Sequence, residues 1–187
     1  MARRELRISG FGGQGVVLAG QILGQAVAVY DKQYATFSQS YGPEARGGAC
    51  SAIVVADEQP IGYPYLTNPD VVVALSQDAY NRYGRTMNPG VKLIVDADLV
   101  KIDANHKHTY LAVPANRLAR ELGRVVVSNI VLLGFFAAVT DFVSTDALRQ
   151  SVLASVPKGT GELNLKAFET GYQYGKKLTS QNGGAHV

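Results

Sequence analysis

Short apolar runs along the chain alternate with longer segments in which apolar residues recur every three or four positions. Strands are expected at residues 6–9, 49–56, 71–75, 91–95 and 109–113, with a weaker candidate at 33–38. The runs at 71–75 and 91–95 are continuous and rich in valine, which is typical of strands buried on both faces of a parallel sheet. The pattern predicts an α/β domain with three layers, in which helices flank a mostly parallel sheet.

The last third of the chain is predicted to be helical. Three helices are expected there, at residues 129–139, 145–156 and 163–178. Ser128 and Ser144 precede the first two helices and are candidate N-caps. Earlier helices are expected at residues 16–28, 76–83 and 114–122. With no linker in the sequence, residues 1–179 are expected to form one domain, and the polar, glycine-rich residues 180–187 a flexible tail.

Composition and charge argue against several classes of protein for this chain, among them nucleic-acid-binding, membrane-spanning and disulfide-bonded proteins. The 187 residues are 47% hydrophobic and 18% charged, as in ordinary globular domains, and the net charge of +3 is spread along the chain, which does not indicate nucleic-acid binding. No secretory signal precedes the first strand, and the longest apolar run, 130–140, is too short to span a bilayer, so a cytoplasmic protein without a membrane partner is expected. The single cysteine, Cys50, excludes an internal disulfide or an iron–sulfur cluster held by this chain alone.

A first glycine loop follows the first expected strand and opens an uncharged helix. Its residues are Gly10, Phe11, Gly12, Gly13, Gln14 and Gly15. A helix that begins at such a loop presents free N–H groups and a positive dipole end, which suit a phosphate or a carboxylate. The glycines match a dinucleotide motif, but Asp31 comes before the second strand rather than after it, and no lysine completes a P-loop. An anion-binding loop and a tight turn needed only for packing both remain open, and dinucleotide binding ranks behind them.

A second loop lies about thirty residues further on and is again rich in glycine. Its candidate residues for an interface or an anion site are Ser40, Tyr41, Gly42, Pro43, Glu44, Arg46, Gly47 and Gly48. The guanidinium of Arg46 suits a carboxylate or phosphate, with Glu44 as its orienting partner, and the alternative is an exposed loop with an incidental ion pair. Because both loops follow strands, they are expected to lie together at the carboxyl edge of the sheet.

The two glycine motifs, the 70–77 segment and the overall length together resemble the gamma subunit of 2-oxoacid:ferredoxin oxidoreductases. The resemblance implies a role in the oxidative decarboxylation of a 2-oxoacid to an acyl-CoA with reduction of ferredoxin. It names 2-oxoglutarate as the first candidate substrate, beside pyruvate and branched-chain 2-oxoacids, and the related indolepyruvate enzymes as the nearest alternative family. It also implies alpha and beta chains as partners, with a ferredoxin-like delta chain as a further candidate. Thiamine diphosphate, magnesium and iron–sulfur clusters would belong to those chains.

The resemblance implies a supporting chain that has no catalytic residue or metal of its own. In long single-chain relatives the corresponding domain meets coenzyme A, and a lysine one turn into the first helix reaches its phosphates. This chain has Gln21 at that position, so the candidate CoA or anion loop is Gly10, Gly12, Gly13, Gln14 and Gly15 together with Gln21. We expect the isolated chain to be inactive and to form a homodimer. A purely structural assembly chain and a free-standing dinucleotide- or anion-binding protein are the alternatives.

Overall fold

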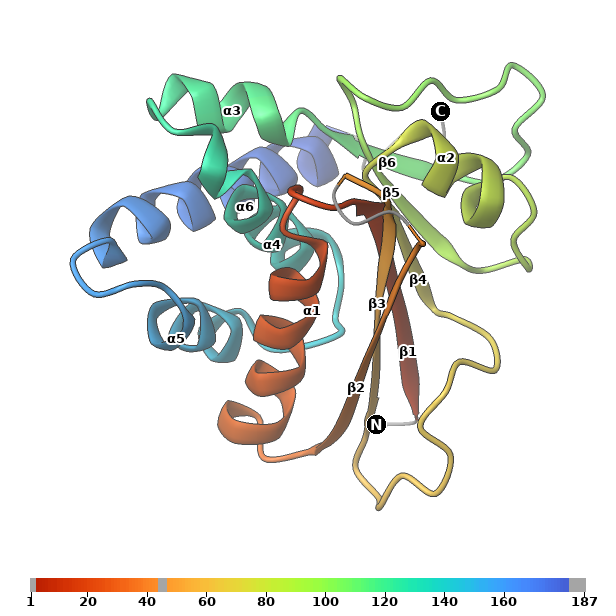
Figure 1. The fold of residues 1–187 in the computed structure, drawn as a ribbon, viewed down its shortest axis with the longest axis horizontal. Helices are drawn as coiled ribbons and strands as arrows, with labels where there is room; N and C mark the ends of the chain where they lie inside the picture. The colour runs from red at the N-terminus through yellow and green to blue at the C-terminus, as the bar shows by residue number, and fades with distance from the viewer. Residues whose placement is uncertain (1–2, 44–46, 182–187) are drawn as a thin grey trace.

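The computed structural model describes residues 3–43 and 47–181, which form a six-stranded sheet with helices on both faces (Figure 1). The strands are β1 (Arg4–Phe11), β2 (Tyr34–Tyr41), β3 (Ala49–Asp57), β4 (Val71–Ala74), β5 (Lys92–Asp96) and β6 (Tyr110–Val113). Their order in the sheet is β2-β3-β1-β4-β5-β6. Among these strands only β3 is reversed, because it pairs antiparallel with both β1 and β2, whereas β1, β4, β5 and β6 pair in parallel. The mostly parallel sheet predicted from the sequence is confirmed.

Along the chain, helices connect several of the strands and make up most of the last third of the sequence. They are α1 (Val16–Gln25), α2 (Gln77–Ala79), α3 (Ala115–Glu121), α4 (Ser128–Val139), α5 (Thr145–Ser155) and α6 (Gly161–Gln181). Both α1 and α2 continue into π-helical turns, at Ala26–Tyr30 and Tyr80–Gly84. The helical C-terminal third is therefore confirmed, and α6 includes the first two residues of the segment expected to form a tail.

The two predicted N-caps have different outcomes. The hydroxyl of Ser144 accepts a hydrogen bond from the N–H of Ala147 at 3.2 Å and so caps α5, as predicted. Ser128 is instead the first residue of α4, and Val127 occupies the cap position without a side-chain hydrogen bond. The prediction for Ser128 was wrong because a 3₁₀ turn, Val125–Val127, leads directly into α4.

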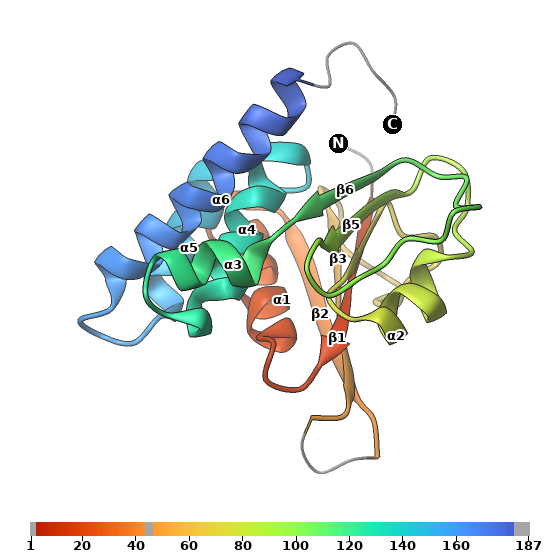
Figure 2. The ribbon, with the colours of Figure 1, turned by 90° about the horizontal axis from the view of Figure 1, so that it is seen from above.

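The two faces of the sheet carry helical layers of very different size. Alternate residues of the central strands point to opposite faces, so Leu6, Ile8 and Val73 join the large core beneath α1, α4, α5 and α6, while Val72 and Leu93 join a smaller core beneath α2 and the turn that follows it. Figure 2 shows the large helical layer on one side of the sheet and α2 on the other. None of the helices in the described part of the chain is long and apolar enough to cross a membrane.

The helices α4 and α6 cross with their backbones in contact. A Cβ placed on Gly134 of α4 would meet the carbonyl oxygen of Phe168 and lie 2.7 Å from its carbonyl carbon. A Cβ on Gly171 of α6 would in turn lie 2.8 Å from the carbonyl carbon of Val131. Glycine is therefore required at both positions for this close approach. The pair fixes the position of α4, whose first turn reaches the carboxyl edge of the sheet.

Candidate functional site

The two glycine loops meet at the carboxyl end of β1, as the sequence predicts. Phe11 at the end of β1 pairs with Ala49 at the start of β3, and one residue further on the N–H of Gly12 donates to the carbonyl oxygen of Gly48 at 2.8 Å. A Cβ on Gly12 would lie 3.3 Å from the backbone nitrogen of Gly47. Close approach of the second loop therefore makes a side chain at residue 12 unfavourable.

Gln14 and Gly15 of the first loop make contacts within the protein. The amide of Gln14 accepts from the N–H of Phe11 at 2.6 Å and donates to the carbonyl oxygen of Leu75 at 2.7 Å, so it ties the loop to the end of β4. Gly15 has a φ of 72° and precedes α1, and a Cβ there would lie 2.7 Å from the amide nitrogen of Asn129. Gln14 and Gly15 therefore both make packing or hydrogen-bond contacts within the protein. No side chain caps α1, which leaves its first N–H groups available to an anion.

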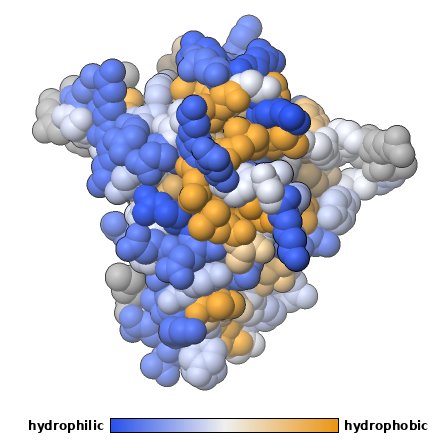
Figure 3. Space-filling view, turned by 90° about the vertical axis from the view of Figure 1, so that its left-hand side faces the viewer, coloured by the Kyte–Doolittle hydropathy of each residue, from blue (hydrophilic) through white to orange (hydrophobic). Residues whose placement is uncertain are grey.

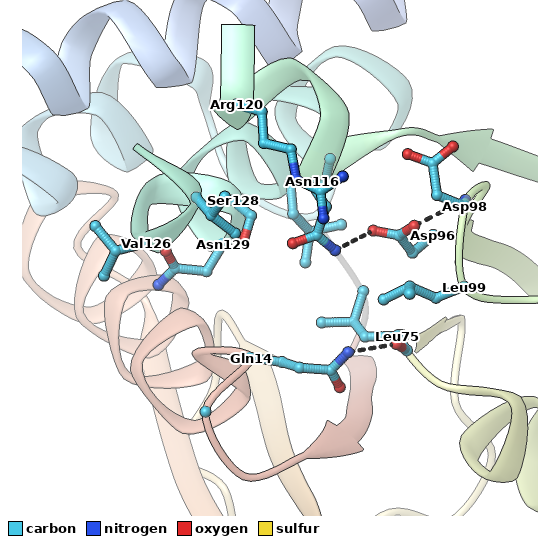
Figure 4. A pocket seen from close by; sticks show the side chains of 14 residues that line it. Gln14, Leu75, Asp96, Asp98, Leu99, Asn116, Arg120, Val126, Ser128 and Asn129 are labelled. Atoms are coloured by element: carbon cyan, nitrogen blue, oxygen red, sulfur yellow. Dashed lines mark hydrogen bonds between the residues drawn. The ribbon is translucent and has the colours of Figure 1, made fainter. Parts of the chain in front are cut away.

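Beside the first loop lies a crevice of about 560 Å³ at the carboxyl edge of the sheet (Figure 4). The helices that follow β1 and β4 pack on opposite faces, and open α/β sheets bind ligands where the connections diverge in this way. The residues that line the crevice include Gly13, Gln14, Leu75, Asp96, Leu99, Asn116, Arg120, Val126, Ser128 and Asn129. They come from the ends of β1, β4 and β5, from α3, from the turn that follows α3 and from the first turn of α4. The wall is therefore part apolar and part polar.

Asp96 is a buried carboxylate at the end of β5 in the wall of this crevice. Its side chain is 2% exposed and accepts hydrogen bonds from the N–H of Asp98 at 2.9 Å and from the amide of Asn116 at 3.2 Å. Burial raises the pKa of Asp96, the charge of Asp98 adds to this effect, and the two hydrogen bonds oppose it. The sequence analysis did not select Asp96 as a site residue, although a polar residue directly after a buried strand is a recognisable signal.

Positive charge at the crevice comes from α3 rather than from α1. Arg120 lines the crevice, whereas Gln21 lies on the exposed side of α1 and is not part of the lining. Asp31, the acid considered for a dinucleotide ribose, instead accepts hydrogen bonds from the N–H and hydroxyl of Ser144 at the start of α5. Asp31 is therefore not in the lining of the crevice beside the first glycine loop, where a ribose-binding acid would have to lie.

The second loop borders another cavity, of about 400 Å³, on the opposite side of the first loop. Ser40, Tyr41 and Gly42 line it together with Ser76 and Arg82 near α2. Tyr41 is 64% exposed. Pro43 is exposed as well, and Gly47 has a φ of 69°. Glu44 and Arg46 lie outside the described residues, so the roles expected for them stay predictions. Residues 3–43 and 47–181 contain no group of three His, Cys, Asp or Glu side chains that could hold a metal ion.

Residues 5–174 match the sequence model of the family described as pyruvate ferredoxin/flavodoxin oxidoreductase. The chain belongs to this family. The 2-oxoglutarate synthase subunit KorC of Methanocaldococcus jannaschii is 46% identical, over 94% of this chain and 96% of that protein. The pyruvate synthase subunit PorC of Methanothermobacter marburgensis is 34% identical, over 90% of this chain and 96% of that protein.

Solved structures of this oxidoreductase family have the same fold. The gamma subunit of a keto/oxoacid ferredoxin oxidoreductase from Geobacter sulfurreducens superposes with a TM-score of 0.84 at 39% identity, covering 96% of this chain and 98% of that one. A 2-oxoglutarate:ferredoxin oxidoreductase from Magnetococcus marinus also gives a TM-score of 0.84, at 21% identity, with 95% of this chain matching 32% of that one. The resemblance to a gamma subunit is therefore confirmed across the length of the chain.

Proposed function

We propose that this chain is the gamma-type subunit of a 2-oxoglutarate:ferredoxin oxidoreductase and that it presents a CoA-binding surface to the catalytic chains. The complex would convert 2-oxoglutarate and CoA into succinyl-CoA and CO₂ and pass two electrons to ferredoxin. The observation that supports 2-oxoglutarate is the identity of 46% with a 2-oxoglutarate synthase subunit, against 34% with a pyruvate synthase subunit, both over at least 90% of this chain. Thiamine diphosphate, magnesium and iron–sulfur clusters are assigned to the other chains.

The residues at the carboxyl edge fit the binding of CoA. The uncapped start of α1 offers N–H groups to a phosphate, and Arg120 supplies the cation that Gln21 does not. The crevice of about 560 Å³ is within the range that small-molecule sites occupy. The related enzyme of Magnetococcus marinus was solved with 2-oxoglutarate, CoA and succinyl-CoA bound. The thiol of CoA would accept the acyl group, while this chain would bind and orient the nucleotide end.

The helical side of the molecule is suited to hold the partner chains. Figure 3 shows apolar side chains gathered between polar ones on this side. Val126, in the turn before α4, is 79% exposed, and Leu153 of α5 is 43% exposed. Exposed apolar patches of this kind mark surfaces that are covered in an assembly. Alpha and beta chains, and a ferredoxin-like delta chain, are the partners we assign to it.

Reconstitution tests the proposed substrate. The chain is co-expressed with the alpha, beta and delta chains of the same complex, and ferredoxin reduction is measured with 2-oxoglutarate, pyruvate and branched-chain 2-oxoacids. We expect the chain to co-purify with the others and the complex to give its highest kcat/KM with 2-oxoglutarate. A preference for pyruvate would contradict the proposed substrate, and failure to co-purify would contradict the role as a subunit.

Two arginines of α3 provide a matched test of CoA binding. Arg120 lines the crevice and Arg117 does not, and both are exposed. Loss of one charge-assisted hydrogen bond costs about 1.5 kcal/mol, so Arg120→Ala should raise the CoA KM about tenfold in the assembled enzyme, with kcat nearly unchanged. Arg117→Ala should leave the CoA KM at the wild-type value. An unchanged KM in Arg120→Ala would remove the crevice from the CoA site.

A further inference from the structure

The strand β2 lies at the edge of the sheet and lacks the features that normally protect an edge. It is eight residues long, Tyr34–Tyr41, and pairs with β3 in an unbroken register without a bulge. It contains no charged residue and no proline. Natural edge strands are usually short, bulged, or marked by lysine or proline, because an open edge can pair with another strand. The open side of β2 is therefore competent to accept a further strand.

The residues that offer hydrogen bonds on the open side can be assigned. The N–H of Gly42 donates to the carbonyl oxygen of Ala49 on β3 at 2.6 Å. Because the direction of these groups alternates along an antiparallel strand, the even-numbered residues 34–40 also point their N–H and C=O groups toward β3. Ala35, Phe37, Gln39 and Tyr41 consequently point theirs outward, in an uninterrupted row.

We propose that two copies of this chain form a dimer by pairing their β2 strands antiparallel, with Ser38 opposite Ser38 of the second copy. This register pairs Ala35 with Tyr41 of the second copy and Phe37 with Gln39 of the second copy, and each such pair exchanges two hydrogen bonds. All four outward-pointing residues of each strand are then satisfied. A shift by two residues in either direction leaves one of the four without a partner. The inference extends the proposed function but does not depend on it.

Side-chain sizes also match in this register. Tyr41 lies opposite Ala35 of the second copy, and Tyr34 lies opposite Gly42 of the second copy, so each large ring faces a small residue. The two tyrosines are 64% and 50% exposed in the single chain. Thr36 lies opposite Ser40 of the second copy, and because the Thr36 hydroxyl donates to the carbonyl oxygen of Pro64 at 3.3 Å, its oxygen is left to accept a hydrogen bond from the Ser40 hydroxyl. The strand is thus self-complementary in shape as well as in its backbone groups.

Neither β2 nor the exposed part of the neighbouring helix α1 carries a charge. The helix α1 packs against β2, since a Cβ on Gly24 would lie 3.6 Å from the Cβ of Phe37, and both views place α1 next to this strand (Figures 1 and 2). The exposed residues of α1 and of the π-helical turn after it are Leu18, Gln21, Ala28 and Val29, none of them charged. This absence of charge beside an uncharged edge favours a second copy as the occupant.

Cysteine cross-linking tests the register in the full-length chain. In the proposed dimer the Ser38 pair is of the type without mutual hydrogen bonds, with Cα atoms about 4.5 Å apart, a separation that a disulfide can bridge. Ser38→Cys should give a covalent dimer on mild oxidation, reversed by a reductant. Thr36→Cys should not, because the two positions lie roughly 13 Å apart along the strands. The double variant Thr36→Cys/Ser40→Cys should cross-link again. The wild-type chain is the control for Cys50, which is buried.

A charge exchange at Ser38 gives a second, independent test. Ser38→Glu and Ser38→Lys each place like charges opposite one another, so each variant alone should sediment as a monomer at tens of micromolar, where the wild-type chain sediments as a dimer. An equal mixture of the two variants should restore the dimer. A monomeric wild-type chain, a dimer that persists in Ser38→Glu, or no cross-link in Ser38→Cys would each overturn the proposal. None of these results affects the proposed function, which is tested by co-purification and substrate preference.

Discussion

Alanine substitutions at two helical glycines, Gly171 and Gly24, should change the free energy of unfolding in opposite directions. In a helix with free space, alanine is more stable than glycine by about 1 kcal/mol. At Gly24 of α1 the new Cβ would lie 3.6 Å from the Cβ of Phe37, an ordinary van der Waals contact, so most of that gain should remain. Gly24→Ala should therefore raise the free energy of unfolding by about 0.5–1 kcal/mol.

At Gly171 of α6 the same methyl group meets only backbone. Its Cβ would lie 2.8 Å from the carbonyl carbon of Val131 and 2.9 Å from the nitrogen of Phe135, and neither group can rotate away. The helices α4 and α6 would have to separate, with loss of dispersion contacts along the crossing. Overpacking in cores costs about 1–3 kcal/mol and in tight sites more, so the net loss should reach about 2 kcal/mol after the gain in helix propensity.

Urea unfolding of the purified chain, followed by circular dichroism, measures both effects. The midpoint should fall for Gly171→Ala and rise for Gly24→Ala, with the slopes unchanged. Because α4 carries Ser128 and Asn129 into the crevice, Gly171→Ala should also raise the CoA KM of the assembled enzyme. A Gly171→Ala chain as stable as the wild type would refute the backbone contact between α4 and α6.

Further predictions concern the first loop, one buried carboxylate and the cofactors. Gly12→Val should displace Gly47 and raise the CoA KM or weaken assembly in the complex, and if neither changes, the loop is only a turn. Burial opposes ionisation of Glu5, but hydrogen bonds from Thr67 and Arg3 outweigh it and lower the pKa of Glu5. The stability that the Glu5 carboxylate supplies is thus fully present above the ordinary pKa of a glutamate and is lost as pH falls through the lowered pKa. In thermal melts at pH values down to about 3, the melting temperature of Glu5→Gln should therefore fall less than that of the wild-type chain. The purified chain should be colourless, and a cluster absorption band would contradict the assignment of clusters to other chains.

Much of the central sheet could be predicted from the chain because its strands are buried on both faces. The valine-rich run at 71–75 has no polar alternation, and only a strand covered on both sides tolerates this. The reversal of β3 was not predicted, because the apolar run at 49–56 carries no information about direction. The short connection between β2 and β3 does indicate that the two strands are antiparallel, since a parallel crossover needs a dozen or more residues.

The close approach of the two glycine loops could be predicted from the sequence, whereas the side chains that line the crevice beside them could not. Glycines at 10–15 and 42–48 indicate close approach of main chains, which the structure contains. Asp96 and Arg120 come from β5 and α3, far along the sequence, and only the order of strands in the sheet brings them to the first loop. Gln14 is polar and exposed to the same crevice, yet its amide is used within the protein. Sequence spacing alone cannot separate a polar group that serves the fold from one left for a ligand.

The reversed direction of β3 explains why the two glycine loops meet at the carboxyl edge of the sheet. Because β2 and β3 form a hairpin, the second glycine loop returns to the edge where β1 ends, and the N–H of Gly12 binds the carbonyl oxygen of Gly48 there. The segments around Gly12 and Gly48, joined in this way, form a ridge of backbone between two cavities, one of about 560 Å³ toward α4 and one of about 400 Å³ toward α2. A ligand or partner that meets this ridge contacts main-chain groups whose positions are set by the sheet. Under the proposed function, recognition at the ridge would depend on the glycines being free of side chains, and charge would come from residues of the cavity walls such as Arg120.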